Sequence, residues 1–171
     1  MLPPDGERPL PRLRAALRAL LPDPTAVRWA LDAGCGAFPT ARTLEELFPA
    51  AVLLGIDRDP FALRGKPSLR LIVGDVARLP LARSVRFDLI LIRHPDVDRH
   101  RQVWQQACLL LPGWLRPGGR VLVSCYAAHE VEAVREMLRA GGALPVTLAG
   151  SLPPVDLSGQ DRYLLGFAPL R

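Results

Sequence analysis

Short apolar runs and longer amphipathic stretches alternate along most of the chain. The apolar runs predict strands at residues 28–32, 51–57, 69–74, 87–93 and 120–125, and helical patterns occupy residues 40–48, 60–65, 99–111 and 129–140. The segment Phe87-Asp-Leu-Ile-Leu-Ile92 is apolar on both faces, which is typical of a strand buried between two helix layers. Strands that alternate with helices in this way predict right-handed crossovers and a mostly parallel sheet.

The two ends of the chain depart from this alternation. Between Leu10 and Leu21 the leucines follow helical spacing with arginines on the other face, so we expect an amphipathic helix that packs on the domain rather than on a membrane. Residues 145–149 and 162–167 are two strand patterns joined by a loop, and strands without a helix between them should pair antiparallel.

These patterns predict an α/β fold with a doubly wound, mostly parallel sheet of seven strands and an antiparallel C-terminal strand. Residues 1–24, a Pro-rich segment with the amphipathic helix, are expected to precede a single domain of residues 25–171.

Composition indicates where the protein is located and whether it has disulfides or a metal site. No apolar run approaches the ~18 residues of a membrane span, and prolines and acids interrupt the N-terminal segment where a secretory signal would stand. A cytoplasmic location is therefore expected, with no membrane partner. The three cysteines, Cys35, Cys108 and Cys125, are an odd number without CxxC spacing, which argues against a disulfide framework and a zinc site. No metal is expected.

The net charge of +5 and the pI of about 9.8 raise nucleic acid as a partner. However, Lys66 is the only lysine, and the arginines are scattered along the chain rather than gathered in a basic block. Nucleic acid is therefore a possible but not favoured partner.

The chemically informative residues stand at the predicted strand ends. The first strand ends in Asp32 and a glycine loop, Gly34-Cys35-Gly36, while the second and third end in Asp57 and Asp75. Ligands of doubly wound sheets bind beyond the carboxyl ends of the strands, so these acids should meet there. Asp32 either contacts the ligand or only braces the glycine turn.

Taken together, these residues resemble the class I S-adenosylmethionine-dependent methyltransferases, whose fold is Rossmann-like. The resemblance rests on Leu31-Asp-Ala-Gly-Cys-Gly36, Gly55-Ile-Asp57, Gly74-Asp75, Leu79-Pro80, Phe87-Asp-Leu-Ile90 and Leu115-Arg-Pro-Gly-Gly-Arg-Val-Leu-Val123. It implies S-adenosylmethionine as the cofactor and a reversed last strand.

The same resemblance assigns roles to the residues at the strand ends. It implies that the loop Gly34–Gly36, with Cys35, holds the methionyl part of the cofactor. Asp57 would accept the ribose hydroxyls, and Asp75 would contact the adenine amino group. The remaining cofactor-binding candidates are Asp32, Arg58, Val76 and Arg93.

Three departures from related patterns matter. The dinucleotide fingerprint G-x-G-x-x-G lacks its last glycine here, which disfavours NAD(P). Where the methyltransferase family usually has a third glycine, this chain has Phe38, whose ring either crowds the methionine moiety or packs beneath the loop. After the fourth strand it has Arg93-His-Pro-Asp96 instead of the Asp/Asn-Pro-Pro-aromatic motif of DNA and protein amide methylases.

His94 is the candidate catalytic base, because its side chain can accept a proton near neutral pH and follows the fourth strand. Asp96 or His100 would orient it, and Tyr126 would line the acceptor pocket. In the alternative interpretation, His94 and Pro95 only shape the loop and cover the cofactor.

The sequence therefore predicts an S-adenosylmethionine-dependent methyltransferase of unassigned acceptor, either a small molecule or RNA. A non-catalytic adenosyl-cofactor or partner-binding module with the same fold is the alternative. The sequence shows no long insertion that would cover the substrate, so a partner subunit in a homo-oligomer could supply a lid.

Overall fold

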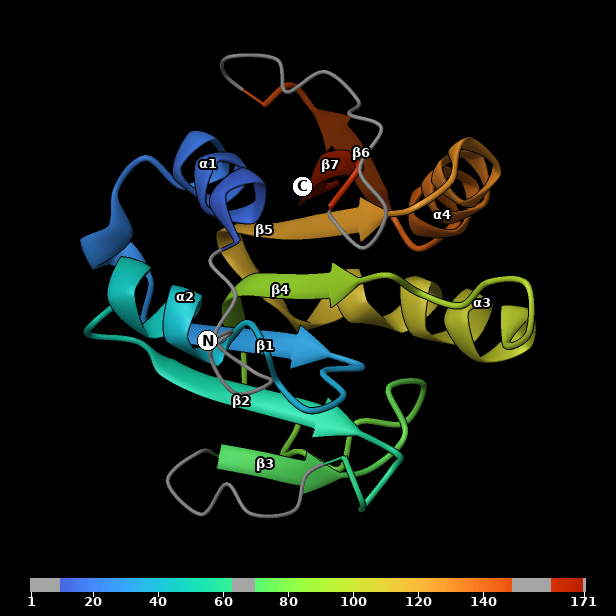
Figure 1. Cartoon of the computed structure of the whole chain (residues 1–171), viewed down its shortest axis with the longest axis horizontal. Helices are drawn as coiled ribbons and strands as arrows, with labels where there is room; N and C mark the ends of the chain where they lie inside the picture. The colour runs from blue at the N-terminus through green and yellow to red at the C-terminus, as the bar shows by residue number, and fades with distance from the viewer. Residues whose placement is uncertain (1–9, 63–69, 149–160, 171) are drawn as a thin grey trace, which may run out of the picture.

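Seven strands form one sheet in the computed structural model, which describes residues 10–62, 70–148 and 161–170 (Figure 1). The spatial order is β3-β2-β1-β4-β5-β7-β6. The strands are β1 (Trp29–Ala33), β2 (Val52–Asp57), β3 (Arg70–Val73), β4 (Phe87–Arg93), β5 (Leu115–Cys125), β6 (Ala143–Val146) and β7 (Tyr163–Pro169). Strands β1 to β5 run parallel, whereas β7 runs antiparallel to both β5 and β6. The predicted α/β sheet with its reversed C-terminal strand is confirmed.

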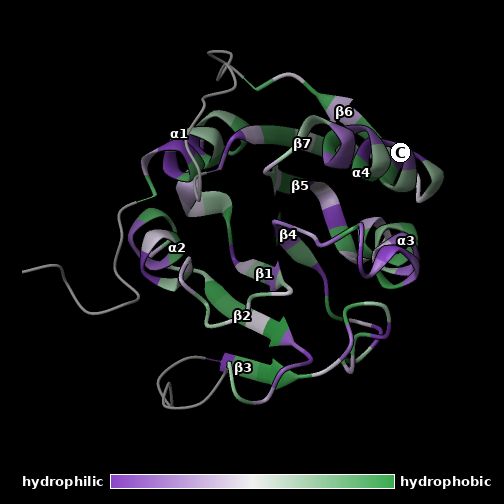
Figure 2. Cartoon of the chain, turned by 45° about the vertical axis from the view of Figure 1, so that its right-hand side comes forward, coloured by the Kyte–Doolittle hydropathy of each residue, from purple (hydrophilic) through white to green (hydrophobic). Residues whose placement is uncertain are grey.

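Helices cover both faces of this sheet (Figure 2). Helices α1 (Pro11–Leu20) and α2 (Ala41–Leu47) pack on one face, and α3 (Arg101–Leu110) and α4 (Ala128–Ala140) pack on the other. Because successive side chains of a strand point to opposite faces, neighbouring residues of β4 join different core layers. Ile90 packs with the α3–α4 layer, whereas Leu91 packs with the α1–α2 layer.

The N-terminal helix follows its amphipathic pattern. Pro11 occupies the first turn, where its missing N–H is not needed, and the apolar face is buried against α2, β5 and β7. Its buried residues are Leu13, Ala16, Leu17 and Leu20. None of the helices in the described ranges has the length and apolarity to cross a membrane.

The helix predicted at residues 60–65 is wrong where it can be compared. Residues 60–62 form a turn, and residues 63–65 lie outside the described ranges. The carboxylates of Asp57 and Asp59 accept hydrogen bonds from the backbone N–H groups two residues ahead, at 2.9 Å in both cases. Such bonds compete with a helix.

Strand β5 is longer than the strand predicted at residues 120–125, because it begins at Leu115. Leu115 pairs with Phe87, and the pairing resumes between Arg120 and Leu89, so residues 116–119 bulge out of one continuous strand. The loop expected between the last two strands lies at residues that the structure does not describe.

Candidate functional site

A cavity opens at the carboxyl ends of β1 to β4, and we call it the carboxyl-edge cavity. Of the candidates for cofactor binding and catalysis, six line it: Gly34, Asp57, Arg58, Asp75, Val76 and His94. The other lining residues are Gly74, Asp96, His100, Val103 and Trp104. The fold thus brings the ends of four strands to one ligand-sized hollow, as a doubly wound sheet should.

The glycine loop is held rigidly at one wall of this cavity. The N–H groups of Gly34 and Cys35 donate to the Ile56 carbonyl at 2.8 and 3.0 Å, and Gly36 N–H donates to Asp57 Oδ2 at 2.8 Å. Gly34 has a φ of 75°, and a Cβ there would lie 3.0 Å from the Trp104 ring. Glycine is therefore required at this position by both its conformation and its neighbour.

Phe38 packs beneath the loop rather than into the cavity. Its side chain is 2% exposed and belongs to the α1–α2 core layer, and it does not line the carboxyl-edge cavity. The absent side chain of Gly55 makes room for it, because a Cβ there would lie 3.1 Å from the Phe38 ring. The Cys35 thiol fills the same space, 2.8 Å from that Cβ position. Of the two alternatives for Phe38, the buried one is observed, although its φ of 52° strains a residue with a side chain.

Asp57 links the glycine loop to the cavity. Its Oδ2 accepts from Gly36 and its Oδ1 accepts from Asp59 N–H, so the carboxylate is fixed at the end of β2. A carboxylate has about four acceptor positions, which leaves room for two ligand hydroxyl groups. Asp75 is exposed at the end of β3, with Oδ1 bonded to Ala77 N–H at 2.8 Å. Both acids fit an adenosine-type ligand.

Asp32 lies below the loop and does not line the cavity. Its side chain is 1% exposed, its Oδ2 accepts from the Thr40 hydroxyl, and its Oδ1 has no partner among the described residues. Burial raises the pKa of Asp32 to about 7, against the Thr40 hydrogen bond and the charge of Arg93, which lower it.

Arg93 forms an ion pair with Asp161, an acid near the C-terminal end of the chain. Its Nε and Nη2 donate to the two carboxylate oxygens of Asp161 at 2.8 and 3.4 Å. Asp161 is 1% exposed and stands just before β7. Arg93 is absent from the lining of the carboxyl-edge cavity, so the structure places this cofactor-binding candidate behind the cavity wall.

His94 stands between the carboxyl-edge cavity and this ion pair. Its ring stacks on Tyr126 with 3.6 Å between centroids, and its Nε2 lies 3.3 Å from Asp161 Oδ1 without forming a full hydrogen bond. The orienting partners expected from sequence bond elsewhere. Asp96 accepts from Arg99 N–H at 3.0 Å, and His100 pairs with Arg58 at 2.9 Å.

Sequence reasoning missed two residues of the site. Trp104 follows the helical pattern of α3 and was indistinguishable from a core residue, yet it lies on Gly34. Asp161 belongs to no motif, but a topological signal existed. An antiparallel strand begins at the sheet edge where its parallel neighbour ends, so an acid before β7 must lie near the end of β5.

The cysteines contribute no exposed nucleophile to this site. All three are buried and none forms a disulfide within the described ranges, and burial raises the pKa values of Cys108 and Cys125 to about 12. Within the described ranges, no group of three or more metal-ligating side chains is present.

Fold and cavity together define a Rossmann-like α/β protein with a cavity at the carboxyl edge of its sheet. A family model described as a methyltransferase domain matches residues 31–123, more than half of the chain. The chain belongs to this methyltransferase family, and it is an S-adenosylmethionine-dependent methyltransferase whose acceptor is not determined.

Solved structures share the fold at low sequence identity. The N-methyltransferase NodS from Bradyrhizobium japonicum WM9 superposes with a TM-score of 0.69 at 21% identity, covering 96% of this chain and 98% of that chain. The S-adenosylmethionine-bound amino pentose methyltransferase CalS10 from Micromonospora echinaspora gives 0.72 at 16% identity, covering 94% and 89%. A methyltransferase from Clostridium acetobutylicum ATCC 824 gives 0.73 at 10% identity, covering 96% and 93%. No curated protein matches the chain in sequence.

Proposed function

We propose that the carboxyl-edge cavity binds S-adenosylmethionine with its adenosine between the ends of β2 and β3. Asp57 accepts the ribose hydroxyls, Asp75 and Val76 contact the adenine, and Arg58 closes this side of the cavity. The methionine end lies along Gly34 and Trp104. The observation that carries this proposal is the fixed carboxylate of Asp57, which bonds to Gly36 while lining the cavity.

The remaining cofactor-binding candidates act from behind the cavity wall in this proposal. Cys35 and Gly36 shape the loop through their backbone, because their N–H groups are bonded to Ile56 and Asp57. Asp32 braces the loop through Thr40, and Arg93 holds Asp161 in place.

When bound, the cofactor supplies a methyl group on a positively charged sulfur. A lone pair of the acceptor attacks this methyl carbon in line, and the sulfur is the group displaced. This chain's own residues then orient the acceptor and remove its proton. His94 is the base in our proposal, since it lines the cavity beyond the end of β4. Tyr126, which is half-exposed and stacked on His94, forms the adjoining wall for the acceptor.

We propose a small molecule with an ionisable amine or hydroxyl as the acceptor, rather than RNA. Arg93 is paired with the carboxylate of Asp161, and Arg58, which donates to His100, is the one arginine among the residues that line the cavity, so little basic charge is gathered there for phosphates. The fold neighbours NodS and CalS10 are named as an N-methyltransferase and an amino pentose methyltransferase. A cytoplasmic location and self-association stay predictions.

Calorimetric titration of Asp57→Asn with S-adenosylmethionine tests the binding mode. The variant can still accept from Gly36 but loses the charge, so cofactor affinity should fall about 10- to 100-fold, the value of a hydrogen bond to a charged group. Asp59→Asn is the matched control, because Asp59 is an exposed acid two residues further on that does not line the cavity. Equal affinities in both variants, or binding of NAD alone, would overturn the proposal.

A panel of small amines and phenols, with total RNA as a parallel arm, tests the acceptor class. Release of the demethylated cofactor should require one of the small acceptors. Turnover with RNA alone would show that the acceptor assignment is wrong while leaving the cofactor site intact.

A further inference from the structure

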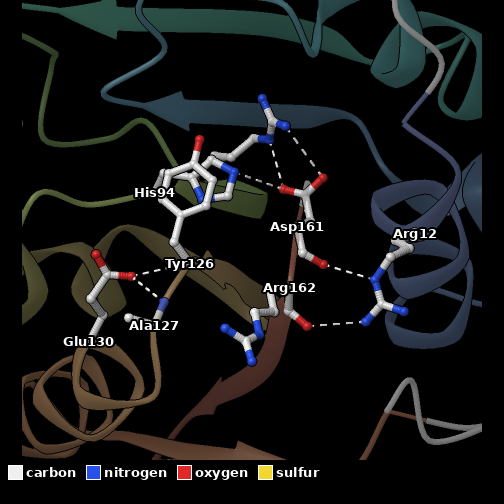
Figure 3. Close-up of polar contacts among 8 residues, drawn as sticks. Arg12, His94, Tyr126, Ala127, Glu130, Asp161 and Arg162 are labelled. Carbon is white, nitrogen blue, oxygen red and sulfur yellow. Dashed lines mark hydrogen bonds and ion pairs between the residues drawn. The ribbon is translucent and has the colours of Figure 1, made fainter. Parts of the chain in front are cut away.

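A buried acid reaches the base candidate from an unexpected part of the chain. Asp161 precedes β7, whereas His94 follows β4, and the antiparallel start of β7 brings the two together (Figure 3). Helix α1 fixes this segment, because Arg12 donates to the carbonyl oxygens of Asp161 and Arg162 at 2.9 and 3.2 Å. The position of Asp161 is thus set from three sides, by Arg12, Arg93 and His94.

The carboxylate of Asp161 stays ionised although it is buried. Burial raises the pKa of Asp161. The hydrogen-bonding groups of His94 and Arg93 beside its oxygens, together with the positive charge of Arg93, outweigh burial and hold the pKa below its usual range. A carboxylate that stays negative can only accept hydrogen bonds, so any ring nitrogen that faces it must carry a proton.

The His94 ring is restrained in the plane that this contact needs. Tyr126 stacks on it with an interplanar angle of 8°, and Glu130 fixes the backbone of Tyr126 by accepting its N–H at 2.8 Å. Both ring nitrogens are buried and neither forms a full hydrogen bond in the described part of the chain, but Nε2 lies 3.3 Å from Asp161 Oδ1. His94 lines the cavity, and a buried polar atom normally has a hydrogen-bond partner, so the partner that Nδ1 lacks could be supplied by a bound acceptor.

On the basis of the proposed function, we propose that Asp161 is a positioning residue that fixes His94 with its proton on Nε2 and leaves Nδ1 free to accept the proton of the acceptor. In the transfer step, the acceptor lone pair forms the new bond to the methyl carbon. The electron pair of the sulfur–methyl bond returns to sulfur, and the acceptor proton moves to Nδ1. The imidazolium that results lies beside the negative carboxylate, which stabilises it.

Nitrogen-15 spectra of the uniformly labelled protein test this arrangement without an acceptor. At pH 8.5, where an ordinary imidazole is neutral, His94 should show a protonated Nε2 and an unprotonated Nδ1 as its single tautomer. In Asp161→Asn the side chain is neutral, so the preference should fall and the Nδ1-protonated form should appear. A merely structural role for Asp161 would not move this signature.

The chain offers a matched control in its second acid–histidine contact. Asp98 lies 3.1 Å from His129, and both side chains are exposed, so Asp98→Asn removes a carboxylate beside a histidine away from His94. It should leave the tautomer of His94 unchanged. Calorimetry with S-adenosylmethionine on the same samples should give affinities within about twofold of the unaltered protein.

The outcomes separate the two proposals. An Nδ1-protonated or evenly mixed His94 in the unaltered protein overturns this inference even if Asp161→Asn does not fold, as does an unchanged tautomer in a folded Asp161→Asn. Failure of the unaltered protein to bind S-adenosylmethionine in the cavity instead overturns the proposed function.

Discussion

Two buried acids lie at the carboxyl edge of the sheet. The surroundings of one raise its pKa and favour its neutral form, whereas those of the other lower its pKa and favour its ionised form. Asp32 at the end of β1 and Asp161 before β7 are each 1% exposed. Burial raises the pKa of Asp32 to about 7, whereas the pKa of Asp161 lies below its usual range because His94 and Arg93 outweigh burial. The difference lies in the partners, since Asp32 has one hydroxyl and Asp161 has a bidentate guanidinium.

The two acids therefore differ in what they can do in the structure. Asp161 is a permanent negative charge that can orient and stabilise a cation, while Asp32 is a polar brace that is only half ionised near pH 7. Equal burial therefore does not imply equal chemistry, and the number of charged donors decides which acid stays ionised.

The largest expected effect comes from breaking the charged pair. Asp161→Leu leaves Arg93, whose side chain is 15% exposed, without its acid, and removal of one partner of a largely buried ion pair costs about 3 to 5 kcal/mol of unfolding free energy. Urea denaturation at pH 7 should detect this loss. The double variant Arg93→Met with Asp161→Leu removes both charges and should recover much of the stability. If the double variant is as unstable as the single one, packing rather than charge explains the loss.

Asp32 should have a smaller effect on the unfolding free energy, and its dependence on pH should be opposite to that of Asp161. Because its folded pKa is raised above the unfolded value of 3.8, the folded state binds the extra proton, and stability falls as pH rises from about 4 to 7. A shift of about three pKa units corresponds to at most about 4 kcal/mol. Asp32→Asn has no such proton, so its unfolding free energy should rise relative to the unaltered protein over that range and level off above pH 7.

Asp161 gives the opposite trend in the same titration. Its folded pKa is depressed, so its stabilisation is present above its unfolded pKa and is lost as pH falls through the acid range. Urea midpoints measured from pH 3 to pH 9 for both acids therefore check the comparison directly. Parallel pH trends for Asp32→Asn and Asp161→Asn would contradict it.

Sequence predicts those residues of the carboxyl edge that directly follow consecutive parallel strands. Asp57 and Asp75 each follow an apolar run, and because parallel strands all end at one edge, the residue pattern alone predicts that both acids lie there, where they line the cavity. Asp161 was missed because its partners, Arg93 and His94, are 67 or more residues away in sequence. Only the antiparallel pairing of β7 with β5 brings them together.

Local conformation limited the prediction in other places. The direction of the Phe38 ring depends on its φ of 52° and on the space above Gly55, neither of which a residue pattern encodes. The turn at residues 60–62 depends on the bonds of Asp57 and Asp59 to the backbone, which overrode the helical spacing.

The smallest expected effect tests the single partner of Asp32. Thr40→Val removes the hydroxyl that donates to Asp32, and because that hydrogen bond lowers the pKa of Asp32, the pKa should rise further. The stability cost should be about 1 kcal/mol at pH 5, where Asp32 is protonated, and nearer 2 kcal/mol at pH 9, where a carboxylate loses its donor. Thr40 caps no helix N–H with its side chain, so helix α2 itself is not weakened through a lost cap. Thr43→Val, at a buried threonine one turn further along α2, is the matched control and should cost the same at both pH values. If the Thr40→Val cost is equally independent of pH, the hydroxyl does not hold the charge of Asp32, and the contrast with Asp161 depends on the charged partners of Asp161 alone.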